Sequence, residues 1–296
     1  MLLCGMTASL FPASRHLEDI VDDGYDVKPL QYLNGGWYVF KSHPVIFCAV
    51  ALLLGLVNEA LSRLWPAPLS SGSLRTELFH TLPIEMARLC LFHGVEAILL
   101  TAIAAMAWQR LENHSLSPMP FLKDWRLLGL IFACATVITV MAWTPVIFVT
   151  SLPSIGGAMA ARITLPLILV LSLIGLILFL YLMVSYTFSY LILLDRQDGI
   201  WNALEGSRRV VNRHWWKVAA FFIVLMFLNV ETYCLVGSAL EILSPGLGFN
   251  WMCMSDMNGG QGAFVLLLLT ALGRAVSGCV LAVAYADIYG KPNAIE

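Results

Sequence analysis

Six long apolar runs follow one another along the chain, separated by shorter segments rich in polar and charged residues. A helix needs about 20 apolar residues to cross the roughly 30 Å hydrocarbon core of a bilayer. The pattern therefore predicts six membrane-spanning helices, at residues 45–64, 82–108, 127–150, 163–194, 218–243 and 263–288. The second run gives the weakest signal because it contains polar residues. The fourth is longer than one perpendicular crossing requires, so it must tilt or leave the bilayer.

The segments before the first and the fifth run have apolar and polar residues arranged with the period of a helix. In residues 199–217 the apolar face consists of Ile200, Trp201, Leu204, Val210, Val211 and Trp215. The opposite face consists of Asn202, Glu205, Arg209, Asn212 and Arg213. Residues 29–44 carry a similar stripe, made of Leu30, Leu33, Trp37 and Phe40, between Pro29 at a helix start and Pro44 at a break. Both segments are typical of amphipathic helices that lie in the membrane interface.

These two amphipathic segments align with each other at a fixed offset along the chain. The identical pairs are Leu33 and Leu204, Gly35 and Gly206, Val39 and Val210, His43 and His214, and Asn58 and Asn229. One hypothesis is a parallel internal repeat, in which the first and second spans correspond to the fifth and sixth. The alternative is chance similarity between two sequences that draw on few residue types.

Composition narrows the class of protein. Of the 296 residues, 59% are apolar and only 12% are charged, and the mean hydropathy is +0.80. Soluble domains carry about 25% charged residues, so these values exclude a soluble enzyme, a disordered chain and a nucleic-acid binder with a broad basic face. The fold class that remains is an all-α transmembrane helical bundle of six spans plus two interfacial helices. We expect residues 1–28 to form a cytoplasmic N-terminal segment and residues 29–296 a single transmembrane domain.

The basic residues orient the bundle, because short loops rich in Lys and Arg stay in the cytoplasm. Twelve lie in segments on one side of the predicted spans: Arg15, Lys28, Lys41, Arg110, Lys123, Arg126, Arg196, Arg208, Arg209, Arg213, Lys217 and Lys291. The opposite loops contain only Arg75 and Arg162. This asymmetry predicts a protein of the cytoplasmic (inner) membrane with both termini in the cytoplasm.

Charged side chains inside the spans are candidates for function, because each costs roughly 2.5–3.5 kcal/mol at a helix centre on insertion scales. One face of the second span carries Glu85, Arg88, His93 and Glu96. The i, i+3 spacing favours one pair between the first two residues and another between the last two. Glu231 in the fifth span and Arg274 in the sixth lie at equal depth, which predicts an ion pair. These side chains either line a solute or proton pathway or form internal salt bridges that hold the helices in register.

A second candidate site is the basic end of the later amphipathic segment. Its residues are Arg208, Arg209, Arg213, Trp215, Trp216 and Lys217. Cations in this position attract anionic phospholipid headgroups by about 1 kcal/mol each. The alternative is that the segment obeys the positive-inside rule and packs on the bundle.

Three segments occur in a recognisable order: YLNGGWYVFKSHPVIF at residues 32–47, LLDRQDGIWNALEGSRRVVNRHWWKV at 193–218 and AVAYADIYG at 282–290. They resemble a group of bacterial integral membrane proteins of unknown function with GW-x-x-F-x-x-x-P and AL-x-x-S signatures. Related sets are the YciC-like proteins and the membrane domain found beside some glycerophosphodiester phosphodiesterases. The resemblance covers about a third of the chain, and the loop at residues 244–262 looks longer than usual. It implies a multi-span bundle in the cytoplasmic membrane, with no assigned activity and no catalytic residues.

Catalytic and nucleotide-binding signatures such as HExxH, GxSxG, Walker and Rossmann motifs are absent from the sequence. We therefore expect no cofactor and a non-enzymatic protein that acts as a scaffold, an assembly factor or a lipid-contacting module. Its expected partners are the bilayer, anionic phospholipids and another membrane protein. Two alternatives remain. One is a small-solute transporter or channel that uses the midplane charges, and the other is a lipid-modifying enzyme with His93 and Glu96 as acid and base, or as ligands of a metal.

Overall fold

The computed structural model describes residues 17–65, 82–112, 119–151, 161–196, 199–228 and 261–290. Within these residues every regular element is a helix, so the predicted all-α class is confirmed. The helices of the long apolar runs are α3 (Pro44–Leu64), α5 (Leu82–Leu111), α7 (Trp125–Ser151), α8 (Ala161–Ser185) with α9 (Ser189–Arg196), α11 (Trp215–Leu228) and α13 (Gln261–Tyr289). The part of the fifth predicted span beyond residue 228 lies outside the described residues.

Length and hydropathy divide these spans into two kinds. Within the described residues, four are long and apolar enough to cross a membrane alone: Pro83–Leu111, Trp125–Pro145, Val170–Arg196 and Thr270–Tyr289. Two bent helix pairs raise the number to as many as six. In one, α2 (Pro29–Ser42) meets α3 at 99°, and in the other, α10 (Ile200–Arg213) meets α11 at 107°. The structure therefore contains the two amphipathic helices that the sequence predicts, and each turns sharply into the following span.

Both bends occur at a histidine, and their backbone geometry is similar. The backbone N–H of His43 donates to the Phe40 carbonyl (3.2 Å), and that of His214 donates to the Val211 carbonyl (3.0 Å). Each amphipathic helix thus ends in a tightened i→i−3 bond. Both helices have 14 residues, and their start positions differ by the offset that aligns the two sequence segments. The internal similarity therefore extends from residue types to helix length and to the place of the bend.

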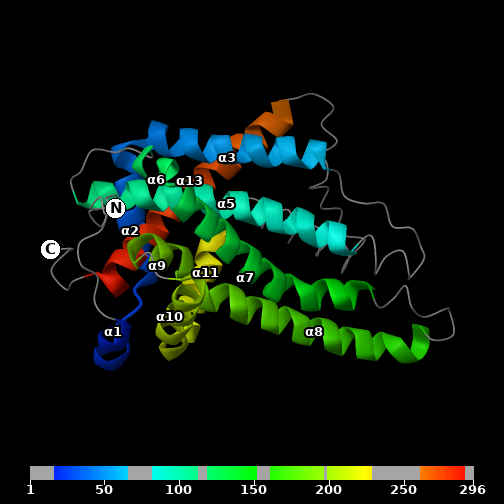
Figure 1. Ribbon diagram of the computed structural model, residues 1–296. Helices are drawn as coiled ribbons and strands as arrows, with labels where there is room; N and C mark the ends of the chain where they lie inside the picture. Colours follow the sequence, from blue (N-terminus) through cyan, green and yellow to red (C-terminus); the bar gives the residue numbers. More distant parts are fainter. Residues whose placement is uncertain are drawn as a thin grey trace, which may run out of the picture.

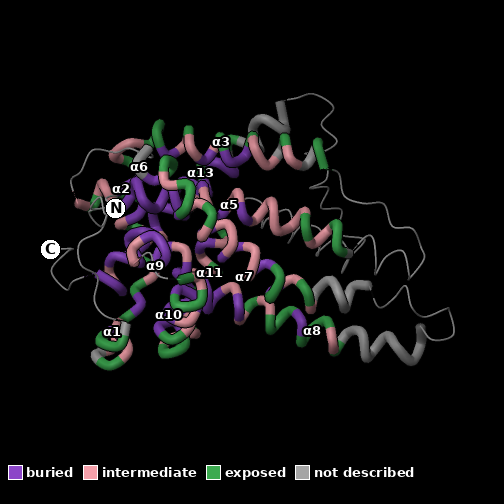
Figure 2. Tube along the Cα trace, viewed as in Figure 1, coloured by how far each residue is buried: buried purple, intermediate pink, exposed green. Residues whose placement is uncertain are grey.

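The core lies where α13 packs against α2, α3 and α5. In the most apolar part of α13, 78% of the residues are buried. In the corresponding part of the span formed by α8 and α9, only 28% are buried. Figure 2 shows the same contrast between the purple helices around α13 and the largely exposed α8. Small residues allow this packing, because a Cβ on Gly36 would collide with the Val280 backbone and one on Gly278 with the Ile103 side chain.

One end of the bundle holds both amphipathic helices and the two short helices α1 (Leu17–Asp23) and α6 (Met119–Lys123). The C-terminal end of α13 lies at this end as well (Figure 1). Helix α1 packs against α10, and Ile20 and Val27 are buried in the same apolar core as the spans. Residues 17–28 of the expected N-terminal segment are thus packed onto the bundle.

Candidate functional site

A charged cluster inside the bundle connects α5 with α13. The Arg274 guanidinium lies 3.3 Å from the Glu96 carboxylate, and His93 Nδ1 lies 3.5 Å from the same carboxylate. The side chain of Arg274 is 5% exposed, whereas those of Glu96 and His93 are 26% and 34% exposed. Across the part of the chain that the structure describes, no group of three His, Cys, Asp or Glu residues is arranged to hold a metal ion.

The other predicted pair on α5 lies apart from this cluster. The guanidinium of Arg88 donates two hydrogen bonds to Glu85, at 3.0 and 2.6 Å, one helical turn away. Arg88 also lies over the Phe92 ring, 5.5 Å from its centre. Because a helix rises about 1.5 Å per residue, this pair is about 12 Å from Glu96 along the axis. The two i, i+3 pairs that the sequence predicts on this helix are therefore both present, as two separate groups.

Arg274 has a partner other than the one expected from the sequence. The expected partner, Glu231, lies outside the described residues, so that pair stays a prediction. Contacts of Ile103 with Gly278 and of Trp108 with Tyr285 show that α5 and α13 run parallel. Glu96 and Arg274 each lie 15 residues before the last residue of their helix. Equal depth on two helices that end at the same side of the bundle was the signal that could have identified the pair.

A cavity of about 220 Å³ lies one helical turn from the charged cluster, between α5, α9, α11 and α13. Leu100 and Thr101 line it one turn after Glu96, and Ser277 and Gly278 line it one turn after Arg274. From α9, Tyr190 lines the cavity and is close enough to Glu96 to interact with it electrostatically. The cluster and the cavity are thus neighbours inside the bundle.

The fourth span, Val170–Arg196, overlaps the predicted run at 163–194 and contains a short irregular stretch beside this cavity. Helix α8 ends at Ser185 and α9 begins at Ser189. The hydroxyl of Thr187 donates to the Met183 carbonyl (3.0 Å) and that of Ser189 to the Tyr186 carbonyl (2.6 Å). Side-chain hydroxyls that bond backbone carbonyls compete with the helix, and the local backbone bonds tighten to i→i−3. The carbonyl of Ser185 accepts a hydrogen bond from the Ser207 hydroxyl of α10 (2.8 Å).

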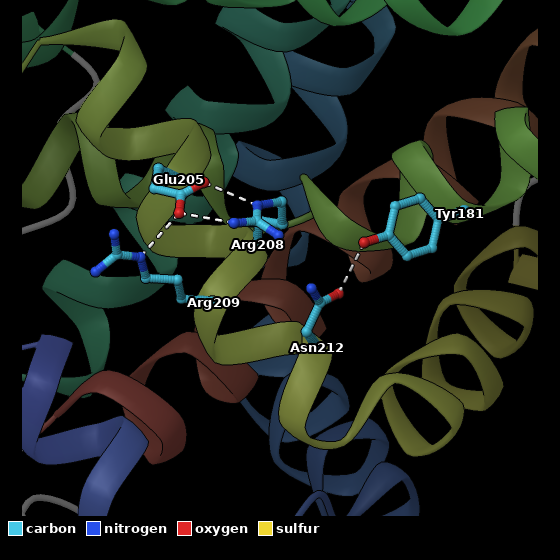
Figure 3. Close-up of polar contacts among 5 residues, drawn as sticks. All are labelled: Tyr181, Glu205, Arg208, Arg209 and Asn212. Carbon is cyan, nitrogen blue, oxygen red and sulfur yellow. Dashed lines mark hydrogen bonds and ion pairs between the residues drawn. The ribbon is translucent and has the colours of Figure 1, made fainter.

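The basic face of α10 is the second candidate site (Figure 3). Arg208 donates two hydrogen bonds to Glu205, at 2.8 and 2.7 Å, and Arg209 donates one at 2.8 Å. These bonds lower the pKa of the Glu205 carboxyl to about 2, with the Arg208 bond as the largest cause. The hydroxyl of Tyr181 donates to the Asn212 side chain (3.2 Å), which connects α8 with α10. Two of the predicted headgroup-binding arginines therefore share one carboxylate on their own helix.

Lys217, another predicted headgroup contact, is also paired with a carboxylate. Its ammonium lies 2.6 Å from Asp26, in the segment between α1 and α2, and this bond lowers the pKa of the Asp26 carboxyl. Arg213 lies beside Gly24 in the same segment. All of Arg209, Arg213 and Lys217 are nevertheless exposed, so their charges face outward at this end of the bundle.

The apolar face of α10 packs on protein, with one correction to the predicted face. Leu204, Val210 and Val211 are buried, and α10 packs mainly against α9. Trp201, which the helical projection assigns to the same face, is 69% exposed because it lies at the edge of the buried stripe. Trp216 is 82% exposed and Trp215 is half-buried.

Exposed aromatic side chains lie on several helices at this end of the bundle. They are Trp37 and Tyr38 on α2, Trp125 at the start of α7, Trp201 on α10 and Trp216 at the start of α11. Tryptophan and tyrosine are enriched at the membrane–water interface, where an amphipathic ring is stable. Their common position marks where the headgroup layer of a bilayer would meet the protein.

Comparisons of the chain with family models, curated proteins and solved structures find no match. The apolar helices, the exposed aromatic residues and the bent helix pairs together indicate a membrane protein that contacts the lipid bilayer.

Proposed function

We propose that this chain is a non-enzymatic, multi-pass protein of the inner membrane that contacts anionic phospholipids through α10 and the start of α11. The observation that carries the proposal is the exposure of Trp201 and Trp216 beside the outward-facing cations Arg209, Arg213 and Lys217. Cations near the headgroups are each attracted to an anionic membrane by about 1 kcal/mol. The buried apolar face of α10 holds these side chains in place on the bundle.

The proposed orientation places both termini in the cytoplasm. It is supported by the basic residues of α9, α10 and α11 and by the position of α1 and the end of α13 at one end of the bundle (Figure 1). A reporter fused after Lys291 should be active only in the cytoplasm, and one inserted within residues 244–262 only outside it. The reverse pattern would overturn the orientation and, with it, the site of headgroup contact.

The resemblance to the YciC-like group belongs to this proposal too. It rests on the residues before α3, on the segment from α9 to α11 and on the end of α13. The first two of these contain the helices that bend at His43 and His214.

The headgroup contact is tested on the full chain in vesicles of phosphatidylcholine with and without phosphatidylglycerol. We expect phosphatidylglycerol to raise the unfolding midpoint of the wild-type protein. A variant that combines Arg209→Gln with Arg213→Gln should show a smaller rise, with Arg213 as the larger contributor because Arg209 is already bonded to Glu205. The matched control combines Lys123→Gln with Arg126→Gln, two exposed cations at the same end but outside α10. An equal loss in both variants would show that general basic charge, and not α10, accounts for the effect.

A small-solute transporter or channel is the second candidate function, and one observation favours it. The Glu96–Arg274 pair lies beside a cavity and an interrupted span, and irregular backbone at membrane depth is tolerated where it is buried in protein or lines a cavity. Proton flux into proteoliposomes should then fall strongly in Glu96→Gln and stay unchanged in Glu85→Gln. Equal flux in both folded variants and in protein-free vesicles would eliminate this candidate.

A further inference from the structure

The cavity beside the charged cluster has the size and chemistry of a binding site for hydrocarbon. An apolar cavity of about 150 Å³ takes up a benzene-sized molecule. The cavity here is about 220 Å³, which is larger than that but below the range of pockets for drug-sized ligands. It therefore has room for part of a flexible chain and not for a whole phospholipid.

Two of the hydroxyl groups in the cavity wall are hydrogen-bonded to nearby backbone carbonyls. The hydroxyl of Thr101 donates to the Ala97 carbonyl of its own helix (2.6 Å), and that of Thr187 donates to the Met183 carbonyl (3.0 Å). Each threonine thus satisfies its hydroxyl within the helix. Most of the remaining wall is aliphatic or aromatic, as with Ala104 and Leu225. Apolar cavities of this kind stay dry and take up apolar molecules.

The side of the cavity formed by α8 and α11 is next to the lipid-facing surface. Met183 on α8 and Met226 on α11 line the cavity and are only half-buried. Leu180, one turn before Met183, and Phe227, next to Met226, are 36% and 52% exposed. Since both helices belong to membrane spans, the hydrocarbon of the bilayer adjoins this side of the cavity. Methionine is also flexible enough to make room for a chain that enters.

We propose that the cavity holds the end of one acyl chain of a bilayer phospholipid, which enters between α8 and α11. This inference rests on the lipid-contacting function proposed above and names the part of the lipid that is bound. The irregular backbone between α8 and α9 forms part of the wall, since Tyr186 and Thr187 line the cavity. The acyl chain fills the apolar part, and the Glu96–Arg274 pair lies one turn before the cavity along α5 and α13.

The experiment uses the full chain in vesicles of phosphatidylethanolamine and phosphatidylglycerol that contain a phospholipid with a photoreactive group at the end of one acyl chain. After irradiation, mass spectrometry compares labelling of the cavity wall with labelling of the exposed face of α8. We expect labelled peptides to include Ala104 and Leu225. Ala104→Leu fills the cavity and should lower wall labelling about tenfold, which corresponds to about 1.4 kcal/mol, with α8 labelling unchanged.

Two further variants keep the result interpretable. Ala87→Leu adds the same group at an exposed position of the same helix and should label as the wild type does. Met226→Trp fills the cavity from its half-buried side and should lower wall labelling even if Ala104→Leu does not fold. Wall labelling that stays at the level of the α8 surface, or that neither filling variant reduces, would overturn the proposal.

Acyl-chain binding in the cavity and headgroup contact at α10 can be tested independently. The variant with Arg209→Gln and Arg213→Gln should keep wild-type labelling of the cavity wall, because these residues do not line it. Ala104→Leu should keep the stabilisation by phosphatidylglycerol. Loss of cavity labelling in the arginine variant would mean that headgroup contact at α10, and not the cavity, controls the labelling.

Discussion

Two carboxylate–arginine clusters in this protein have similar contacts and opposite surroundings. Inside the bundle, Glu96 lies 3.3 Å from Arg274, whose side chain is only 5% exposed. At the end of the bundle, Glu205 accepts hydrogen bonds of 2.7–2.8 Å from Arg208 and Arg209, whose side chains are 40% and 61% exposed. The inner pair joins two helices that are far apart in the sequence, whereas the outer cluster lies within a single helix.

The difference shows that burial, more than contact distance, sets how much an ion pair contributes to the stability of the fold. A buried charge that loses its partner has no water to replace it, so breaking such a pair costs about 3–5 kcal/mol. An exposed i, i+4 pair on a helix contributes only about 0.3–0.5 kcal/mol, because water solvates the separated charges. We therefore expect the inner pair to stabilise the packing of α5 on α13, and the outer cluster mainly to set the charge that faces the headgroups.

The largest expected effect comes from breaking the inner pair. Glu96→Gln removes the carboxylate that lies 3.3 Å from the buried Arg274 guanidinium and should lower the free energy of unfolding by about 3–5 kcal/mol. The double variant Glu96→Gln with Arg274→Gln should recover most of this loss, because the guanidinium that lost this carboxylate is removed as well. Thermal unfolding in detergent measures both. A double variant as unstable as the sum of its two single variants would show that the two side chains do not act as a pair.

A much smaller effect is expected from breaking the outer cluster. Glu205→Gln removes the acceptor shared by Arg208 and Arg209 and should lower the free energy of unfolding by about 0.3–0.5 kcal/mol for each pair. The same variant should strengthen binding to vesicles that contain phosphatidylglycerol, since both arginines are then free to contact headgroups. A loss of stability as large as that of Glu96→Gln would remove the contrast between the two clusters.

The smallest effect is a pH dependence of the outer cluster. Its carboxyl has a pKa of about 2 in the folded protein, below the ordinary value of about 4.3, because Arg208 and Arg209 bond to the ionised form. The stabilisation is therefore present above about pH 4 and is lost as the pH falls towards 2. The difference in unfolding midpoint between wild type and Glu205→Gln should shrink over that range, and salt should reduce it throughout. A difference that grows on acidification would contradict this sign.

Much of the candidate site follows from helical spacing, but its assembly does not. The i, i+3 spacing is enough to predict that Glu85 meets Arg88 and that His93 meets Glu96, because both pairs lie on one helix. The contact between Glu96 and Arg274 needs the further information that α5 and α13 are parallel neighbours. The exposure of Trp201 likewise depends on how α10 is rotated on α9, which a helical projection does not specify.

The sequence alone predicted the all-α membrane class, the four spans that are long and apolar enough by themselves and the two amphipathic helices. These features depend on local period, run length and charge, which act within one helix at a time. Only the tertiary structure decided the partner of Arg274, the break between α8 and α9 and the cavity beside them. These depend on which helices approach closely enough to touch, and that is set by small residues such as Gly36 and Gly278 acting across the whole bundle.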